Sequence, residues 1–181
     1  MTHPRDETRP PDPTVLIPRK RIEQRVAELG REIDAAYAGS EELVCIAVLK
    51  GAAFFLVDLV RALETPVAVD FLQTSSYGSR ATPGEVRIRR DVDLPLRDRD
   101  VLLVEDIVDT GWTLETLLAL LRLRRPRSLK LCALLDKPAR REVEVPVDFL
   151  GFTVPDRFIV GYGLDHAERW RNLPYIGTVD V

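Results

Sequence analysis

Runs of apolar residues alternate along the chain with polar segments, and their spacing predicts strands and helices in turn. Across 18–39 the apolar residues recur every three or four positions, which is typical of an amphipathic helix. The unbroken apolar runs at 43–49 and 101–104 have the length of strands that are buried on both faces. A helical pattern follows each run, at 54–63 and at 114–123. We therefore expect an α/β fold with a mainly parallel central sheet flanked by helices.

Weaker patterns extend this arrangement along the chain. Further strands are expected at 67–72, 85–90 and 128–135, within 145–154, and at 158–162. The stretch 166–177 is expected to form a short helical turn followed by an extended segment. Residues 1–13 are rich in proline and in charge, so we expect a mobile tail there and a single domain over 14–181.

The composition narrows the class of protein without identifying it. The chain has 181 residues, of which 45% are hydrophobic and 30% charged, as in an ordinary globular domain. The net charge of −3 gives no support for a nucleic-acid or membrane partner. Because we find no apolar run long enough for a membrane span or a signal core, we expect a cytoplasmic protein. Cys45 and Cys132 lie inside apolar runs and are expected to be buried free thiols.

A polar stretch follows the apolar run at 101–104 and contains the main candidate chemistry. Glu105 and Asp106 come first, and Asp-Thr-Gly-Trp-Thr at 109–113 forms what we expect to be one tight turn before the next helix. The start of a helix offers free backbone N–H groups that suit a phosphate. Two carboxylates would repel a bare phosphate, but they suit a ligand that also carries hydroxyls or a divalent cation. A solvated loop with a threonine cap is the alternative.

Other polar segments are expected at the same edge of the sheet. Lys50 and Gly51 end the run at 43–49, and Lys137 ends the run at 128–135. The places of Lys50 and Gly51 between strand and helix favour an anion site, although a surface lysine and a turn glycine are the alternatives. For Lys137 the alternative is a solvated lysine before Pro138. The polar run at 74–79 is either a solvated hairpin tip or a lid over a site.

The stretch VLLVEDIVDTGWT at 101–113 resembles the phosphoribosyl pyrophosphate motif of type I phosphoribosyltransferases, and its Asp-Thr-Gly form resembles the 6-oxopurine branch. The resemblance runs from about Leu49 to Gly177. The stretch 154–177 is similar to the purine-binding hood segment of this family. The implied fold is the type I phosphoribosyltransferase fold, with a small hood formed by elements near 137–181.

The resemblance also implies roles for the central loop. Glu105 and Asp106 would bind the ribose hydroxyls, either directly or through Mg²⁺. Asp109 would accept or share a proton at purine N7 as the general base. The 5′-phosphate would be held by Thr110, Gly111 and Thr113, and the other substrate-binding residues of this loop would be Ile107 and Trp112.

The remaining implied roles belong to residues outside that loop. Lys137 would read the purine 6-oxo group, Phe158 would stack on the base, and the backbone of Ile159 would contact it. Asp165 would bind a second metal ion and Arg171 the pyrophosphate. The rest of the implied set comprises Lys50 and Gly51 in a pyrophosphate loop with a cis Leu49–Lys50 bond, and Ser76 and Tyr77 in a loop that closes over the site.

The implied reaction transfers the 5-phosphoribosyl group from phosphoribosyl pyrophosphate to N9 of hypoxanthine or guanine, with Mg²⁺ as cofactor. The implied assembly is a homodimer or homotetramer. Three alternatives stay open: a regulator on the same fold that senses phosphoribosyl pyrophosphate, an enzyme for xanthine or adenine, and an α/β domain without activity.

Overall fold

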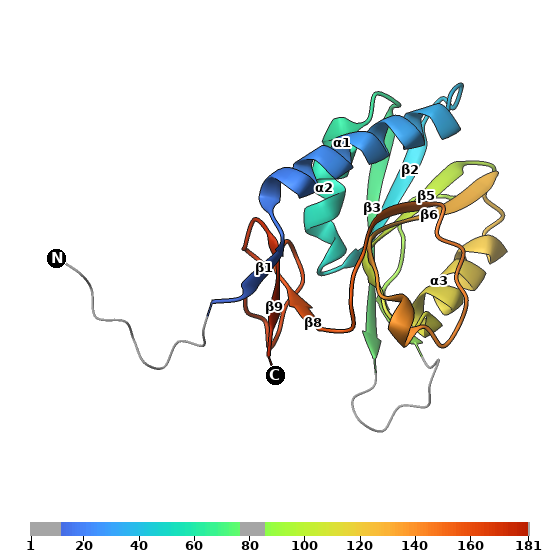
Figure 1. Ribbon diagram of the computed structural model, residues 1–181. Helices are drawn as coiled ribbons and strands as arrows, with labels where there is room; N and C mark the ends of the chain where they lie inside the picture. Colours follow the sequence, from blue (N-terminus) through green and yellow to red (C-terminus); the bar gives the residue numbers. More distant parts are fainter. Residues whose placement is uncertain (1–11, 77–85, 181) are drawn as a thin grey trace.

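The computed structural model describes residues 12–76 and 86–180, and most of their strands form one large sheet (Figure 1). In spatial order its strands are β4 (Val86–Arg90), β3 (Val67–Ser76), β2 (Leu43–Leu49), β5 (Asp100–Val108), β6 (Ser128–Asp136) and β7 (Phe149–Thr153). β4 pairs antiparallel with β3, and the other neighbouring strands are parallel. The prediction of a mainly parallel central sheet is confirmed. In such a sheet, ligands bind beyond the carboxyl ends of the strands.

Helices cover both faces of this sheet and bury its apolar residues. The helix α1 (Arg19–Ala36) and the helix α2 (Ala52–Ala62) pack together over one face, and α3 (Trp112–Leu123) covers the other (Figure 1). Alternate residues of β5 show the division: Leu102 and Val104 pack with α1 and α2, whereas Val101 and Leu103 pack with α3. This alternation is the reason for the unbroken apolar run at 101–104, since a strand covered on both faces needs no polar side.

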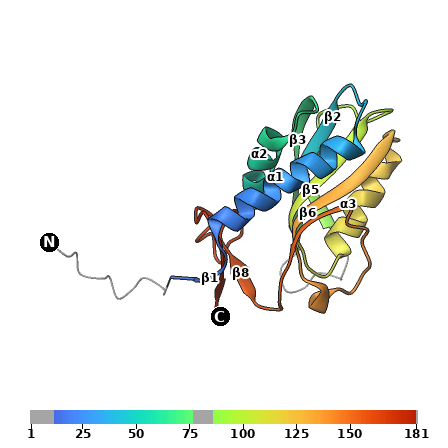
Figure 2. The ribbon, with the colours of Figure 1, turned by 45° about the horizontal axis from the view of Figure 1, so that its top comes forward.

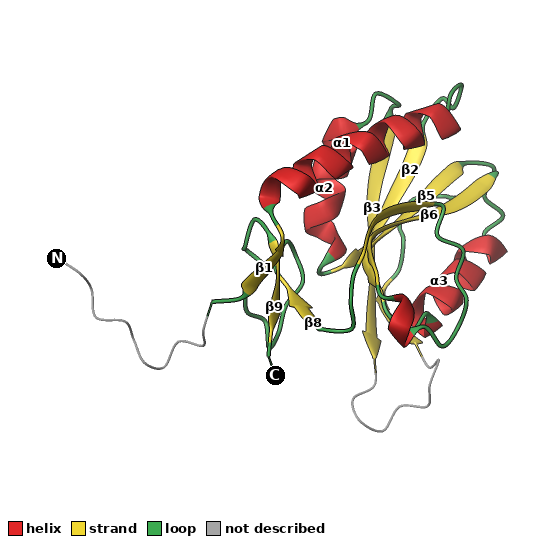
Figure 3. Ribbon diagram, in the orientation of Figure 1, coloured by secondary structure: helices red, strands yellow, loops and turns green. Residues whose placement is uncertain are grey.

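A second, three-stranded sheet lies beside the start of α1 and joins the two ends of the described chain (Figure 3). Its order is β1 (Thr14–Ile17), β9 (Ile176–Val179), β8 (Phe158–Val160), and all pairs are antiparallel. From a second angle, α1 runs from this sheet across the large one (Figure 2). Of the segment expected to form the hood, β7 pairs with β6 in the large sheet, and only β8 and β9 enter the small one.

Several boundaries differ from those expected. The helices expected at 54–63 and 114–123 each begin two residues earlier, and β3 continues past Leu72 to Ser76 because β4 pairs with its end. Pro13, the last residue of the expected tail, is buried, and β1 was not predicted at all. The helical turn expected near 166 is wrong: this stretch has tight turns with three residues at positive φ, Ala167, Glu168 and Trp170.

The main correction concerns the acidic residues of the central stretch. β5 does not end at Val104 but continues through Glu105 and Asp106 to Val108, paired with β6 along this length. The polar side chains mask the strand in the sequence, while the backbone pairing with β6 maintains it. Because successive side chains of a strand point to opposite faces, the two carboxylates leave β5 in different directions.

Two smaller points concern the rest of the described chain. Cys45 and Cys132 are buried free thiols, as predicted. Among the helices of residues 12–76 and 86–180, none is both long and apolar enough to cross a bilayer.

Candidate active site

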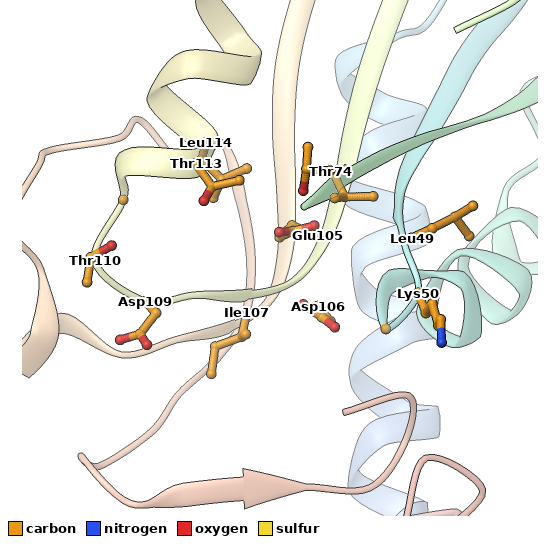
Figure 4. A pocket seen from close by; sticks show the side chains of 13 residues that line it. Leu49, Lys50, Thr74, Glu105, Asp106, Ile107, Asp109, Thr110, Thr113 and Leu114 are labelled. Atoms are coloured by element: carbon orange, nitrogen blue, oxygen red, sulfur yellow. The ribbon is translucent and has the colours of Figure 1, made fainter. Parts of the chain in front are cut away.

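A cavity of about 300 Å³ opens at the carboxyl ends of β2 and β5, where the sequence predicts a ligand site (Figure 4). It brings together Lys50 and Gly51 of the expected pyrophosphate loop, the acidic pair Glu105 and Asp106, and most of the loop at 109–113, which is expected to hold a phosphate. The lining residues that were predicted are Lys50, Gly51, Glu105, Asp106, Ile107, Asp109, Thr110, Gly111 and Thr113. Those that were not predicted as site residues are Val48, Leu49, Thr74 and Leu114. Of these, Val48 and Leu114 are buried apolar residues, whose patterns indicated only core packing.

The loop before α3, at 109–111, forms one side of this cavity. Gly111 is the N-cap of α3 and has a φ of 98°, which glycine adopts without strain. No described side chain caps this helix end, so its first N–H groups remain available to a ligand. The hydroxyl residues Thr110 and Thr113 line the cavity beside them. Free N–H groups, hydroxyls and a positive helix end together suit a phosphate group.

Glu105 is a buried carboxylate that the described residues leave incompletely satisfied. Its side chain lines the cavity, and its Oε2 atom has no hydrogen-bond partner among them. Burial raises the pKa of Glu105 well above its usual range, and the charge of Asp106 adds to the rise. A buried polar atom without a partner is costly, so this oxygen is suited to bind a ligand hydroxyl or a cation.

Asp106 faces the pyrophosphate loop. A Cβ atom on Gly51 would overlap the carboxylate of Asp106, so only glycine fits at position 51 with Asp106 in place. Burial raises the pKa of Asp106 to about 6, while the Ile107 N–H group and the charge of Arg171 act in the opposite direction. The pKa of Asp106 should therefore change when a charged ligand binds near Lys50 and Gly51.

Asp109 is held by a residue that the sequence analysis missed. Arg140 Nε lies 3.0 Å from Asp109 Oδ1, an ion pair without hydrogen-bond geometry. The segment that carries Arg140, η1 (Pro138–Arg140), follows Lys137 directly. The only signal for it in the sequence is the basic pair Arg140-Arg141 after Pro138.

Both ends of the stretch 137–143 are hydrogen-bonded to the end of β5 and the loop that follows it. Lys137 N–H donates to the Val108 carbonyl at 3.0 Å, and the N–H groups of residues 142 and 143 both donate to the Thr110 carbonyl at 2.9 and 3.0 Å. Trp112 is not part of the cavity lining, and its Nε1 atom donates to Glu142 Oε2 at 3.0 Å. Hydrogen bonds therefore connect the segment after Lys137, on the side expected to bind the base, to the loop at 109–113, which is expected to bind the phosphate.

The residues expected to read the purine lie next to this junction but outside the cavity lining. Lys137 is buried, and its Nζ donates to the Arg157 carbonyl at 2.8 Å, so the solvated-lysine alternative is wrong. Phe158, which follows Arg157 and begins β8, exposes 40% of its surface, and its ring packs edge-on against that of His166 at 4.8 Å. Ile159 is buried within β8. An exposed aromatic face near a buried cation is suited to a planar base with an acceptor group.

The pyrophosphate loop contacts the segment after β8. The Leu49–Lys50 peptide bond is cis, as predicted. Lys50 Nζ lies 2.9 Å from the Glu168 carboxylate, and Arg171 lies 2.7 Å from Asp165. Asp165 and Arg171 are outside the cavity lining, but both of their charges act on the pKa of Asp106. Ser76 is the last residue of β3, while Tyr77 and most of the loop expected to close the site lie outside the described residues.

The acidic residues of the site could bind a metal ion only if a bound substrate supplied some of the metal ligands. In the part of the chain that the structure describes, no three His, Cys, Asp or Glu side chains converge on one point. The unpartnered oxygen of Glu105 and the cavity-lining carboxylate of Asp106 nevertheless each suit a hard divalent cation, which prefers oxygen ligands. Such an ion commonly takes its remaining ligands from water and from substrate phosphates.

Comparison with known proteins agrees with this geometry. Residues 17–167 match the family model described as the phosphoribosyl transferase domain. The chain belongs to the phosphoribosyltransferase family. This phosphoribosyltransferase is 51% identical over 167 residues to the hypoxanthine phosphoribosyltransferase of Salmonella typhimurium, a match that covers 91% of the chain and 94% of the relative.

Solved structures give the same result. A hypoxanthine-guanine phosphoribosyltransferase from Bacillus anthracis, with HEPES in its active site, is 44% identical with a TM-score of 0.88, covering 92% of this chain and 98% of that one. The hypoxanthine phosphoribosyl transferase of Trypanosoma cruzi, studied for the role of its C-terminal region in oligomeric state and activity, is 37% identical with a TM-score of 0.90, covering 95% and 94%. The type I phosphoribosyltransferase fold expected from the sequence is confirmed.

Proposed function

We propose that this phosphoribosyltransferase transfers the 5-phosphoribosyl group of phosphoribosyl pyrophosphate to N9 of hypoxanthine and of guanine, in purine salvage. The products are IMP or GMP and pyrophosphate. The observation that carries the proposal is one cavity lined by both halves of the expected substrate site, the Lys50-Gly51 loop and the Asp109–Thr113 loop. The close relatives named as hypoxanthine phosphoribosyltransferases support the choice of base.

Each side of the cavity has a distinct task in this reaction. The start of α3, with Thr110 and Thr113, holds the 5′-phosphate and so fixes the ribose. Glu105 accepts from a ribose hydroxyl, which satisfies its unpartnered oxygen. The bond from C1′ to the pyrophosphate oxygen breaks as N9 forms its bond to C1′. The carboxylates nearby favour the positive charge that develops on the sugar.

Asp109 and Lys137 act on the base. Asp109 takes the proton at N7 as N9 attacks, a general-base role typically worth ~10²–10⁴-fold in rate. Lys137 donates to the 6-oxo group, since its ammonium has three donors and the Arg157 carbonyl uses only one. Adenine carries an amino group at this position, so its donor would face the donors of Lys137.

Mg²⁺ is the cofactor we propose. Glu105 and Asp106 would bind the ribose hydroxyls directly or through one ion, and Asp165 would hold a second ion, with substrate phosphate oxygens as the remaining ligands. The metal would supply positive charge that favours departure of pyrophosphate. Full turnover in excess chelator would contradict this assignment; we expect chelator to abolish activity and added Mg²⁺ to restore it.

We also propose that the enzyme is a homodimer or homotetramer. This proposal follows from the resemblance to the family. Light scattering of the purified full chain tests this, and a monomeric mass at assay concentration would contradict it.

The test of the function is a steady-state assay of hypoxanthine, guanine, xanthine and adenine, each with phosphoribosyl pyrophosphate and Mg²⁺. We expect nucleotide formation and pyrophosphate release with hypoxanthine and guanine. Turnover of adenine or xanthine alone would contradict the proposed base selection. Absence of pyrophosphate release with all four bases would contradict the enzymatic function itself.

A further inference from the structure

Glu168 lies between the two cations that are expected to bind pyrophosphate. Its Oε1 atom is 2.9 Å from Lys50 Nζ, and its Oε2 atom is 3.4 Å from Nε and Nη2 of Arg171. The two oxygens of one carboxylate therefore contact two cations from distant parts of the chain. Two neighbouring oxygens on a pyrophosphate group could make the same pair of contacts.

The backbone around Glu168 holds the carboxylate in this position. Glu168 has a φ of 63°, and its N–H group donates to Asp165 Oδ2 at 2.8 Å. Arg171 Nη1 donates to the Gly163 carbonyl at 2.7 Å. The backbone of Gly163 approaches the Gly51 carbonyl so closely that a Cβ atom at 163 would overlap it. The turn at Gly163, which Arg171 ties to the turn that carries Glu168, therefore lies directly against the pyrophosphate loop.

The contact between Glu168 and Lys50 is one that an incoming anion can replace. The side chains of Lys50 and Glu168 are 56% and 64% exposed, and exposed ion pairs contribute little stability. Arg171 is only 20% exposed and keeps Asp165 as a partner at 2.7 Å. Movement of Glu168 therefore leaves Arg171 in place, while Lys50 becomes free to bind another anion.

From this arrangement we infer that Glu168 is an internal substitute for pyrophosphate. Its carboxylate neutralises Lys50 and Arg171 when the site is empty, competes with the product for both cations, and so favours product release. The inference rests on the proposed function, in which pyrophosphate leaves next to Lys50. It assigns Glu168 an effect on product binding, whereas the chemical step belongs to other residues.

The test compares Glu168→Gln with Glu28→Gln. The Glu168→Gln change removes the charge and keeps the shape of the side chain. Glu28 is a matched control on α1, because it pairs with Arg25 at 3.0 Å and Arg25 keeps Glu32 at 2.7 Å. Two measurements are made on the parent and both variants: the inhibition constant of pyrophosphate in the forward reaction, and the dissociation constant of magnesium pyrophosphate by calorimetry.

Removal of the competing carboxylate should tighten pyrophosphate binding by about three- to tenfold, the range expected for one or two exposed ion pairs. Glu28→Gln should match the parent. An unchanged or weaker affinity in Glu168→Gln would overturn the inference, and a weaker one would show that Glu168 instead orients Lys50 for the anion. A parent protein that neither turns over nor binds pyrophosphate would overturn the proposed function, which keeps the two failures distinct.

Discussion

Two buried carboxylates of β5, one at its amino end and one in its carboxyl half, have opposite surroundings. At the amino end, Asp100 accepts hydrogen bonds from Ser40, Ser128 and the guanidinium of Arg127. The bond from Arg127 holds the pKa of Asp100 well below its usual range. In the carboxyl half, Glu105 has an oxygen without a partner among the described residues, and burial raises its pKa. The protein itself satisfies the first carboxylate and leaves the second to be satisfied by a ligand.

Within one strand, Asp100 therefore serves the stability of the fold and Glu105 serves ligand binding. A satisfied buried carboxylate stabilises the fold, whereas an unsatisfied one destabilises the free protein and gains its partners on binding. Substitutions at the carboxyl end of the sheet should therefore reduce activity and spare stability. Substitutions at the amino end should do the reverse. The following changes test this division in order of expected effect.

The largest effect is expected for Asp109→Asn, which keeps the shape of the side chain and removes the base. We expect kcat to fall by ~10²–10⁴-fold, because proton transfer at N7 loses its acceptor. The melting temperature should change little, since the side chain is partly exposed and its main charged contact is Arg140. Turnover at the parent rate would show that Asp109 is not the general base.

The next effect concerns two lysines near opposite ends of β6. For Lys137→Met we expect kcat/KM for hypoxanthine to fall by about 10- to 100-fold, the worth of a hydrogen bond to a charged group. Lys130→Met is the matched control, because Lys130 lies over the ring of Phe149, 5.6 Å from its centre, in the amino half of the strand. An equal loss of activity in both variants would remove Lys137 from the base site.

Asp100→Asn should reduce stability without reducing the activity of the folded protein. Loss of the charged hydrogen bonds should lower the free energy of unfolding at pH 7 by about 2–3 kcal/mol. Since the folded pKa of Asp100 is depressed, its stabilisation is present above the unfolded pKa of about 3.9 and is lost as the pH falls below it. Urea titrations at pH 7 and pH 3 measure this, and a difference between parent and variant that persists undiminished at pH 3 would contradict it.

The smallest effect, of opposite sign, is expected for Asp106→Asn without metal or ligand. The folded pKa of Asp106 is about 6, above the unfolded value of about 3.9, so its ionisation destabilises the fold as the pH rises through this window. Linkage over this window amounts to at most about 3 kcal/mol, and Asp106 is partly exposed, so that solvent screens part of it. The variant should therefore be more stable than the parent by about 1 kcal/mol at pH 8 and equal to it near pH 4. A variant less stable than the parent at pH 8 would show that Asp106 is already satisfied, as Asp100 is.

The contrast within β5 also shows which features the sequence could predict. The apolar run at 101–104 predicted the strand because helices cover both of its faces. The motif at 105–113 predicted a phosphate site because its residues are neighbours in the sequence. The continuation of β5 through Glu105 was not predicted, since pairing with β6 maintains it against the local polarity. β1 was missed because its pairing partner, β9, lies at the far end of the chain.

The same reasoning applies to the site residues. Lys50, Gly51 and the loop at 109–113 were found because each directly follows a strand on the same edge of the sheet. The contact of Arg140 with Asp109 and that of Glu168 with Lys50 depend on how distant turns fold back onto those loops. Neither contact could be predicted from the spacing of residues in the sequence.

The most direct test of the division within β5 is the rise in melting temperature caused by phosphoribosyl pyrophosphate and Mg²⁺, measured for the parent, Asp100→Asn and Glu105→Gln. A ligand at about 100 times its dissociation constant stabilises a protein by about 2.7 kcal/mol, or roughly 5–11 °C for a chain of this size. We predict that Asp100→Asn melts at a lower temperature but keeps the full rise, and that Glu105→Gln loses most of the rise. A full rise in Glu105→Gln, or its loss in Asp100→Asn, would contradict the account.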